Sequence, residues 1–164
     1  MKAIYPGTFD PITFGHINIL EKAARMFDEV ILAVADYTAK ENYFSLEERF
    51  ELCKQSTAHI PNVQVLVFSG LVVDFARAQG SKILVRGLRA VSDFEYELSL
   101  ALTNIKLSAD IETVFLVPSL RYMYLSSSMI RQLAELDAGL HDFVPECVAR
   151  ALVELVKGEN DAQN

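Results

Sequence analysis

The chain has 164 residues and a net charge of −7, with 51% hydrophobic and 23% charged residues. This length suits one domain, and the composition excludes a disordered or low-complexity chain. The acidic balance argues against a duplex nucleic-acid partner, which needs a broad basic face, but it permits a small phosphorylated ligand held by a few local cations. No apolar run approaches the roughly 18 residues that span a bilayer, so we expect no membrane association.

The N-terminal residues and the cysteines predict where the protein acts. The opening segment, MKAIYPGTFDP, lacks the basic stretch and the long apolar stretch of a signal peptide. The two cysteines, Cys53 and Cys147, are far apart and lack metal-type spacing. We therefore expect reduced thiols, no metal site built from protein side chains, and a cytoplasmic location.

Strand and helix patterns alternate along the chain. Apolar runs predict strands at residues 2–5, 30–35, 63–68, 82–85 and 113–117. Helical periodicity predicts helices near residues 17–27, 45–58, 71–79, 92–107, 127–138 and 145–156. Two capping boxes, Ser45 with Glu48 and Ser92 with Glu95, mark the starts of two of these helices.

This order predicts the α/β class: a Rossmann-like, five-stranded parallel sheet with helices on both faces and C-terminal helices. We expect residues 1–157 to form a single domain and residues 158–164 to form a frayed tail. Ligands bind beyond the carboxyl ends of the strands in such sheets. The loops at that edge are residues 6–15, 36–44, 69–70, 86–91 and 118–127, and they hold nearly all of the chemically distinctive residues.

The loop after the first predicted strand is the first candidate site. The chain contains neither GxxxxGK[ST] nor GxGxxG, which argues against P-loop ATPases and ordinary dinucleotide enzymes. Instead, the loop ends in Gly15-His16, which places His16 on the first turn of a helix. Unpaired N–H groups and the helix dipole favour anions there and disfavour an imidazolium, so we expect a neutral histidine that donates a hydrogen bond. The alternative is an exposed histidine without a task.

A serine run near the C-terminus is the second candidate. Ser126, Ser127 and Ser128 precede Met129-Ile130-Arg131 at a predicted helix start, where hydroxyls and backbone N–H groups can bind phosphate oxygens. Serine alone is a weak signal because it is a common N-cap. Together with Gly15-His16, on the same edge of the sheet, the run resembles the second half of the signature of the T/HxGH nucleotidyltransferase superfamily. Members of that superfamily transfer a nucleotidyl group from a nucleoside triphosphate.

The third candidate is the segment RGLRAVSDFEYE at residues 86–97. Arg86 and Arg89 supply two forked guanidinium groups at the ligand edge, and Lys40 adds one more cation there. In an acidic protein this favours a polyanionic phosphate site. The alternative is a pair of solvated arginines that form ion pairs with Asp93 or Glu95, and for Lys40 an ordinary surface lysine.

The three segments together resemble the bacterial phosphopantetheine adenylyltransferase family, over about residues 2–156. The resemblance implies transfer of the adenylyl group of ATP to 4′-phosphopantetheine, which gives 3′-dephospho-coenzyme A and pyrophosphate. It further implies Mg²⁺ carried with ATP, a homohexamer, and possible feedback binding of coenzyme A.

The resemblance also implies residue roles. His16 would stabilise the transition state. The acceptor would be bound by Thr8, Lys40, Val72 and Arg86. ATP would be bound by Thr8, Phe9, His16, Gly87, Leu88, Arg89, Glu97, Tyr122, Met123, Tyr124, Leu125, Ser126, Ser127 and Ser128. For Asp10 and Asp74, the sequence leaves open whether the role is structural or ligand-binding.

Two other functions remain as alternatives. One is a sister nucleotidyltransferase with a different phosphorylated acceptor, against which the segment at residues 86–97 argues. The other is a non-catalytic adenine-nucleotide sensor, which loss of His16 or of the serine run would favour, and both are present.

Overall fold

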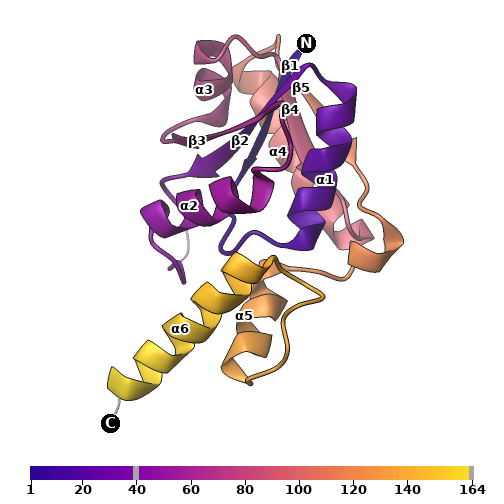
Figure 1. Ribbon diagram of the computed structural model, residues 1–164. Helices are drawn as coiled ribbons and strands as arrows, with labels where there is room; N and C mark the ends of the chain where they lie inside the picture. Colours follow the sequence, from indigo (N-terminus) through magenta and orange to yellow (C-terminus); the bar gives the residue numbers. More distant parts are fainter. Residues whose placement is uncertain (39–40, 163–164) are drawn as a thin grey trace.

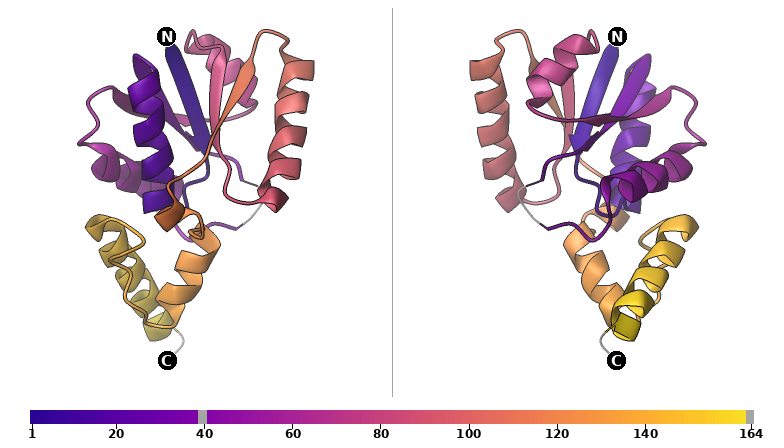
Figure 2. Two further views of the ribbon diagram at one scale, coloured as in Figure 1. Left: turned by 90° about the vertical axis from the view of Figure 1, so that its right-hand side faces the viewer. Right: turned by 90° about the vertical axis from the view of Figure 1, so that its left-hand side faces the viewer.

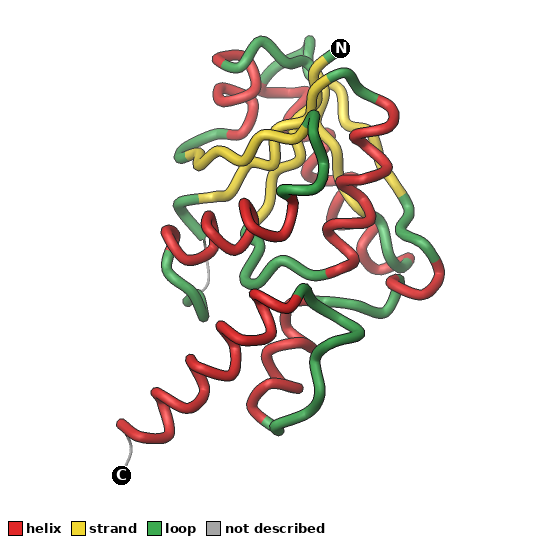
Figure 3. Tube along the Cα trace, viewed as in Figure 1, coloured by secondary structure: helices red, strands yellow, loops and turns green. Residues whose placement is uncertain are grey.

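The structure is a computed structural model that describes residues 1–38 and 41–162 (Figures 1 and 3). Its elements in chain order are β1 (Lys2–Gly7), α1 (Phe14–Met26), β2 (Glu29–Ala35), α2 (Leu46–Thr57), β3 (Val63–Phe68), α3 (Val72–Ala78), β4 (Ile83–Gly87), α4 (Val91–Leu107), β5 (Glu112–Leu116), a 3₁₀ turn η1 (Leu120–Tyr122), α5 (Ser127–Glu135) and α6 (Glu146–Ala162).

The five strands form one sheet in the order β3-β2-β1-β4-β5, and every pair is parallel. This confirms the predicted fold class. The chain builds outward from β1 through β2 to β3, and then returns to place β4 on the other side of β1. The gap between β1 and β4 is therefore the topological switch point, where the loops at the carboxyl ends of two neighbouring strands diverge and leave a crevice.

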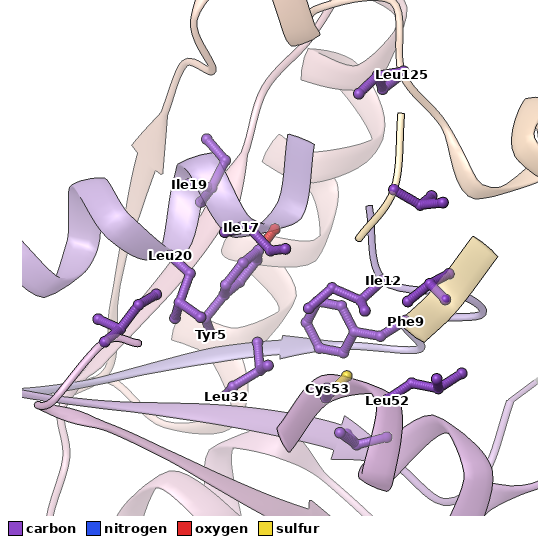
Figure 4. Packing of buried hydrophobic residues seen from close by; sticks show 14 of the residues in the cluster. Tyr5, Phe9, Ile12, Ile17, Ile19, Leu20, Leu32, Leu52, Cys53 and Leu125 are labelled. Atoms are coloured by element: carbon purple, nitrogen blue, oxygen red, sulfur yellow. The ribbon is translucent and has the colours of Figure 1, made fainter. Parts of the chain in front are cut away.

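Helices cover both faces of the sheet (Figure 2). On one face, α1 and α2 pack against the sheet in the larger hydrophobic cluster, which includes Tyr5, Leu20 and Leu32. Figure 4 shows Phe9 and Ile12, from the loop after β1, beside Leu52 and Cys53 of α2 in this cluster. On the other face, α3 packs on β1, β2 and β4 in a smaller cluster. The sheet therefore has two covered faces, as the apolar strand runs predict.

The helix starts differ in how well the sequence predicts them. The Ser45–Glu48 capping box is present, with both reciprocal hydrogen bonds. The Ser92–Glu95 box was predicted wrongly: α4 begins at Val91 with Ala90 as its N-cap, and no described side chain caps it. The physical reason is that Asp93, at the third position of the helix, accepts a hydrogen bond from the backbone N–H of Arg89 at 3.2 Å.

The two last helices lie side by side beyond the carboxyl ends of the strands (Figures 1 and 2). α5 ends at Glu135, three residues before its predicted end, because Asp137 adopts a left-handed conformation with φ of 54°. The N–H groups of Asp137 and Ala138 then bond to the carbonyls of Ala134 and Leu133, which is the Schellman pattern. α6 continues to Ala162, so residues 158–162 of the predicted tail are helical.

None of the helices in the described part of the chain is long and apolar enough to cross a membrane.

Leu152 anchors α6 to the larger cluster, with 0% of its surface exposed. Replacing it with alanine removes buried methyl groups and leaves a cavity, so we expect Leu152→Ala to lower the free energy of unfolding by about 2–5 kcal/mol in a urea titration. The next residue, Val153, is 42% exposed and serves as the control. Val153→Ala should change the free energy by no more than about 0.5 kcal/mol. Equal effects of the two substitutions would contradict the packing of α6 on the core.

Candidate active site

A cavity of about 540 Å³ opens at the switch point between β1 and β4. Its walls come from the loop after β1, the loop after β2, the end of β4, α4, and the start of α5. Among the described residues, three arginines line it, Arg86, Arg89 and Arg131. A concave site lined by forked cations suits a phosphorylated ligand.

His16 stands on the first turn of α1, held by a capping box that the sequence analysis did not anticipate. The N-cap is Thr13, whose hydroxyl oxygen accepts a hydrogen bond from the His16 N–H at 3.4 Å. In return, the Thr13 N–H donates to Nδ1 of His16 at 3.1 Å. Because Nδ1 accepts this hydrogen bond, the proton of the neutral ring resides on Nε2. The ring therefore offers a single N–H donor.

The surroundings keep that ring neutral. Burial lowers the pKa of His16 to about 3, and the charges of Arg89 and Arg86 act in the same direction. The ring of Phe9 meets the imidazole edge-on, with ring centroids 5.1 Å apart. A neutral imidazole at a helix N-terminus can stabilise negative charge that develops on a phosphate. This agrees with the neutral donor that the sequence predicts at this position.

Phe9 lines the cavity, and its ring packs between His16 and Tyr5. Its ring is buried and also packs edge-on against Tyr5, at 5.4 Å between centroids. The ring folds back over Gly7, where an added Cβ would lie 2.8 Å from its Cζ atom. Gly7 is therefore required for the close approach of this ring to the backbone.

Asp10 is a structural residue in this arrangement. Its two carboxylate oxygens accept hydrogen bonds from the backbone N–H groups of Tyr43 and Phe44, at 2.8 and 2.9 Å. Burial raises the pKa of Asp10, while the bond from Phe44 and the charge of Arg131 oppose the shift. Asp10 thus ties the loop after β1 to the segment that leads into α2.

Arg86 and Glu97 form a two-bond ion pair in the wall of the cavity. Nε and Nη2 of Arg86 donate to the carboxylate of Glu97 at 2.7 and 2.6 Å, and Nη1 donates to the carbonyl of Pro6 at 2.7 Å. Burial disfavours the charge of Arg86, but the hydrogen bond and the charge of Glu97 outweigh it, so the pKa of Arg86 is raised. The guanidinium is oriented by β1 and α4 before any ligand binds.

The second arginine of the segment, Arg89, joins three parts of the site. Its Nε donates to Asp93 at 3.2 Å, and its Nη1 donates to the carbonyl of Leu125, just before the serine run. The alternative that the sequence left open, an ion pair with Asp93, is therefore present. This ion pair leaves Arg89 in the cavity wall, because the paired side chain still lines the cavity.

The three serines have three different environments. The Ser126 hydroxyl caps α5 by accepting a hydrogen bond from the Met129 N–H at 3.1 Å. The Ser127 hydroxyl donates to the carbonyl of Pro11 at 2.8 Å, which docks α5 on the loop after β1. Ser128 lies 3.4 Å from a guanidinium nitrogen of Arg131. Ser127 and Ser128 line the cavity.

The structure brings together ten of the residues that the sequence assigned to the site. They are Thr8, Phe9, His16, Arg86, Gly87, Arg89, Glu97, Leu125, Ser127 and Ser128. Val72 lines an adjoining cavity of about 290 Å³, which shares Thr8, Arg86 and Glu97 with the first. Lys40 lies outside the described residues.

Five of the residues assigned to the site from the sequence do not line the cavity at the switch point. They are Leu88, Tyr122, Met123, Tyr124 and Ser126. The Leu88 N–H donates to the carbonyl of Leu116, and Tyr122 faces a separate cavity of about 550 Å³ between α1 and α6. Tyr124 is exposed and packs edge-on against Phe143. Ser126 is occupied as the N-cap of α5.

Several cavity residues were not assigned from the sequence. Arg131 donates to the carbonyl of Asp10 at 2.9 Å and follows Ser128 by three positions, which places both on one face of α5. That spacing could have identified it. Thr13 precedes His16 by three, which is the spacing of a capping box, but the box is usually sought with glutamate or glutamine. Tyr37 and Tyr96 carry no sequence signal of this kind.

In the part of the chain that the structure describes, no group of three or more His, Cys, Asp or Glu side chains could hold a metal ion.

Comparisons with known proteins agree with this geometry. The family described as Cytidylyltransferase-like matches residues 4–133. A solved structure from Vibrio parahaemolyticus, of a protein assigned as a nicotinate-nucleotide adenylyltransferase, shares the fold with a TM-score of 0.67 and 14% identity, over 93% of this chain and 97% of that one. Fold and site thus define a nucleotidyltransferase of the cytidylyltransferase-like class.

Curated relatives narrow this class. The chain is 51% identical to the phosphopantetheine adenylyltransferase of Dictyoglomus thermophilum over 154 residues, which cover 94% of each chain. It is 48% identical to that of Caldanaerobacter subterraneus subsp. tengcongensis, over 94% of this chain and 97% of the relative. The chain therefore belongs to the phosphopantetheine adenylyltransferase family, which confirms the resemblance carried by its three motifs.

The depressed pKa of His16 predicts a specific titration. Between pH 8 and pH 5 we expect the ring to remain neutral with its proton on Nε2, because both burial and the nearby arginines disfavour the imidazolium. The ¹⁵N shifts of its imidazole, followed by NMR, should stay constant over this range. The exposed His59 provides the comparison in the same spectra. A His16 titration centred near 6.5 would contradict the tautomer and its role as a neutral donor.

Proposed function

We propose that the chain transfers the adenylyl group of ATP to 4′-phosphopantetheine, which yields 3′-dephospho-coenzyme A and pyrophosphate in coenzyme A biosynthesis. The observation that carries this proposal is a neutral, single-donor His16 set among three arginines at the switch point of the sheet. Relatives of about 50% identity that bear the name phosphopantetheine adenylyltransferase support the choice of acceptor.

The reaction is one in-line displacement. An oxygen of the acceptor phosphate attacks the α-phosphorus of ATP and forms a new P–O bond, while the bond from the α-phosphorus to the bridging oxygen breaks and pyrophosphate leaves with that oxygen. The attacking oxygen is already anionic, so the step requires no general base. Catalysis then rests on positioning two anions and on stabilising the charge of the pentavalent phosphorus.

His16 is the catalytic residue in this proposal. The hydrogen bond at Nδ1 fixes the direction of the Nε2–H donor, so it can bind an α-phosphate oxygen without reorganisation of the ring. Neutrality matters because the ring then stabilises developing charge without holding the charged ground state tightly.

The proposed binding residues divide between the two substrates. Thr8, Lys40 and Arg86 bind the acceptor phosphate, and Val72 lines the adjoining cavity for the pantetheine arm. ATP is bound by Phe9, Gly87, Leu88, Arg89 and Glu97, by residues 122–128, and also by Thr8 and His16. Mg²⁺ arrives with ATP and neutralises part of the charge of its phosphates.

Self-association is the second part of the proposal, and we expect a homohexamer. Phe94, Leu98, Leu102 and Ile105 repeat at helical spacing along α4 and are exposed. They form an apolar stripe that the described chain covers only at its start, where the Phe94 ring meets Phe115. The neighbouring face of α4 carries Glu97 into the active-site wall. A second copy of the chain on the stripe would cover it beside the site.

Three further proposals complete this reading. Residues 1–157 form one nucleotidyltransferase domain, supported by a single large cluster that joins residues from Ala3 to Leu152. The protein acts in the cytoplasm, where ATP and the acceptor are present. Coenzyme A binds as a feedback ligand, because it carries both substrate halves and can fill both cavities.

The direct test is pyrophosphate release from ATP and Mg²⁺. We expect release with 4′-phosphopantetheine and none with nicotinate mononucleotide or glycerol 3-phosphate. His16→Ala should lower kcat by about 10²–10³-fold with little change in ATP binding, because it removes one donor that acts in the transition state.

His59→Ala is the matched control, since His59 is exposed and outside the cavity, and it should retain the wild-type kcat. Pyrophosphate release with a control acceptor would support a nucleotidyltransferase but reject 4′-phosphopantetheine as its acceptor. ATP binding without release with any acceptor would favour a nucleotide sensor.

The apolar stripe predicts the effect of a charge on assembly. Leu102 is 59% exposed, and Leu102→Glu should reduce the hexamer to smaller species in light scattering coupled to size exclusion, because a carboxylate cannot be buried unpaired. Leu136→Glu is the control, as Leu136 is 78% exposed just after α5. A hexamer that survives the Leu102 change would place the interface elsewhere.

A further inference from the structure

Arg49 of α2 is a buried cation that the proposed chemistry does not use. Only 1% of its surface is exposed, and it does not line the cavity. No carboxylate among residues 1–38 and 41–162 forms an ion pair with it. Burying a charge without an ionic partner is costly, and arginine is almost never fully buried in this way. Stability alone is therefore a poor reason for a charged residue here.

Its hydrogen bonds connect three segments that surround the end of the cavity where the acceptor is proposed to bind. Nη1 donates to the carbonyls of Thr8 and Ala35 at 2.9 and 2.8 Å, and Nε donates to the carbonyl of Phe44 at 3.3 Å. Thr8 is the first residue after β1, Ala35 is the last residue of β2, and Phe44 precedes the N-cap of α2. One guanidinium thus supplies the N–H donors that these chain ends lack.

The bond to Thr8 also sets the direction of a peptide group. In a trans peptide the C=O and the N–H point in opposite directions, so holding the Thr8 carbonyl toward Arg49 turns the Phe9 N–H away from it. Thr8 and Phe9 line the cavity and Arg49 lies behind them. The Phe9 N–H has no acceptor among the described residues. Such an N–H is available to a phosphate oxygen.

Asp10 completes the arrangement from the opposite side. Its carboxylate accepts the N–H of Phe44, while Arg49 donates to the carbonyl of the same residue. Phe44 is therefore fixed at both of its backbone polar groups, one held from the loop after β1 and the other from α2. The loops after β1 and β2 cannot shift independently while both contacts persist.

We propose that Arg49 is a positioning residue for the acceptor phosphate. It fixes Thr8 and the Phe9 N–H at the phosphate-binding end of the cavity and places a permanent positive charge behind them. This inference rests on the proposed function, because that function identifies the anion at this end as the phosphate of 4′-phosphopantetheine.

The test compares 4′-phosphopantetheine with pantetheine, which lacks the phosphate, by calorimetry without ATP. In Arg49→Lys the charge remains, but one ammonium cannot span three carbonyls as the planar guanidinium does. We expect binding of 4′-phosphopantetheine to weaken by about tenfold or more, as loss of charge-assisted hydrogen bonds does, and binding of pantetheine to change less than about twofold. Arg25→Lys, at an exposed position in the last turn of α1, should change neither.

A purely structural Arg49 would affect both ligands equally or only the melting temperature, and either result overturns the proposal. If Arg49→Lys does not fold, the wild-type protein labelled with ¹⁵N-phenylalanine carries the test. 4′-Phosphopantetheine should shift the Phe9 amide resonance and pantetheine should not, and an unchanged resonance also overturns the proposal. If the wild type binds 4′-phosphopantetheine and pantetheine equally, the proposed acceptor is refuted. If the wild type prefers 4′-phosphopantetheine and Arg49→Lys keeps that preference, only the role of Arg49 is refuted.

Discussion

The reversal of strand order between β1 and β4 is the constraint on which this molecule depends. Two parallel strands end side by side there, but the chain leaves them in opposite directions, toward α1 after β1 and toward α4 after β4. The resulting crevice has backbone N–H groups and a helix N-terminus on one wall and the Arg86–Glu97 pair on the other. His16, Arg86 and Arg89 are all positioned at this crevice, so the chemistry proposed for them follows from the topology.

The three arginines at the site are ordered before a ligand binds. Arg86 is paired with Glu97, Arg89 with Asp93, and Arg131 lies 3.9 Å from Asp10. These pairs reduce the repulsion among the arginines in the ligand-free protein and fix their directions. They also explain how a chain of net charge −7 can bind polyanions: a local set of oriented donors decides binding, and the overall charge does not. His16, which stays neutral between these cations, adds a donor without adding charge.

The sequence was a good guide wherever local pattern determined the outcome. The strand at Val63–Phe68 and the Ser45–Glu48 box follow from neighbouring residues, and both are present as predicted. Prediction failed where a second local interaction competed with the one that the pattern indicates. At the start of α4, the carboxylate of Asp93 accepts a hydrogen bond from the Arg89 N–H, and the N-cap is Ala90 and not Ser92. At the end of α5, the left-handed Asp137 ends the helix three residues before its predicted end.

By itself, the sequence determined the alternation of strands and helices, the parallel sheet, and the three motifs that place the chain in its family. Local periodicity and residue type encode these features over a few positions. Only the tertiary structure decided which polar groups pair. Arg86 meets Pro6 across 80 positions of sequence, and Arg131 meets Asp10 across 121. In the sequence, Arg49 looks like an ordinary charged helix residue. Its three carbonyl partners come together only in the fold, because the packing of the strands and loops places them there.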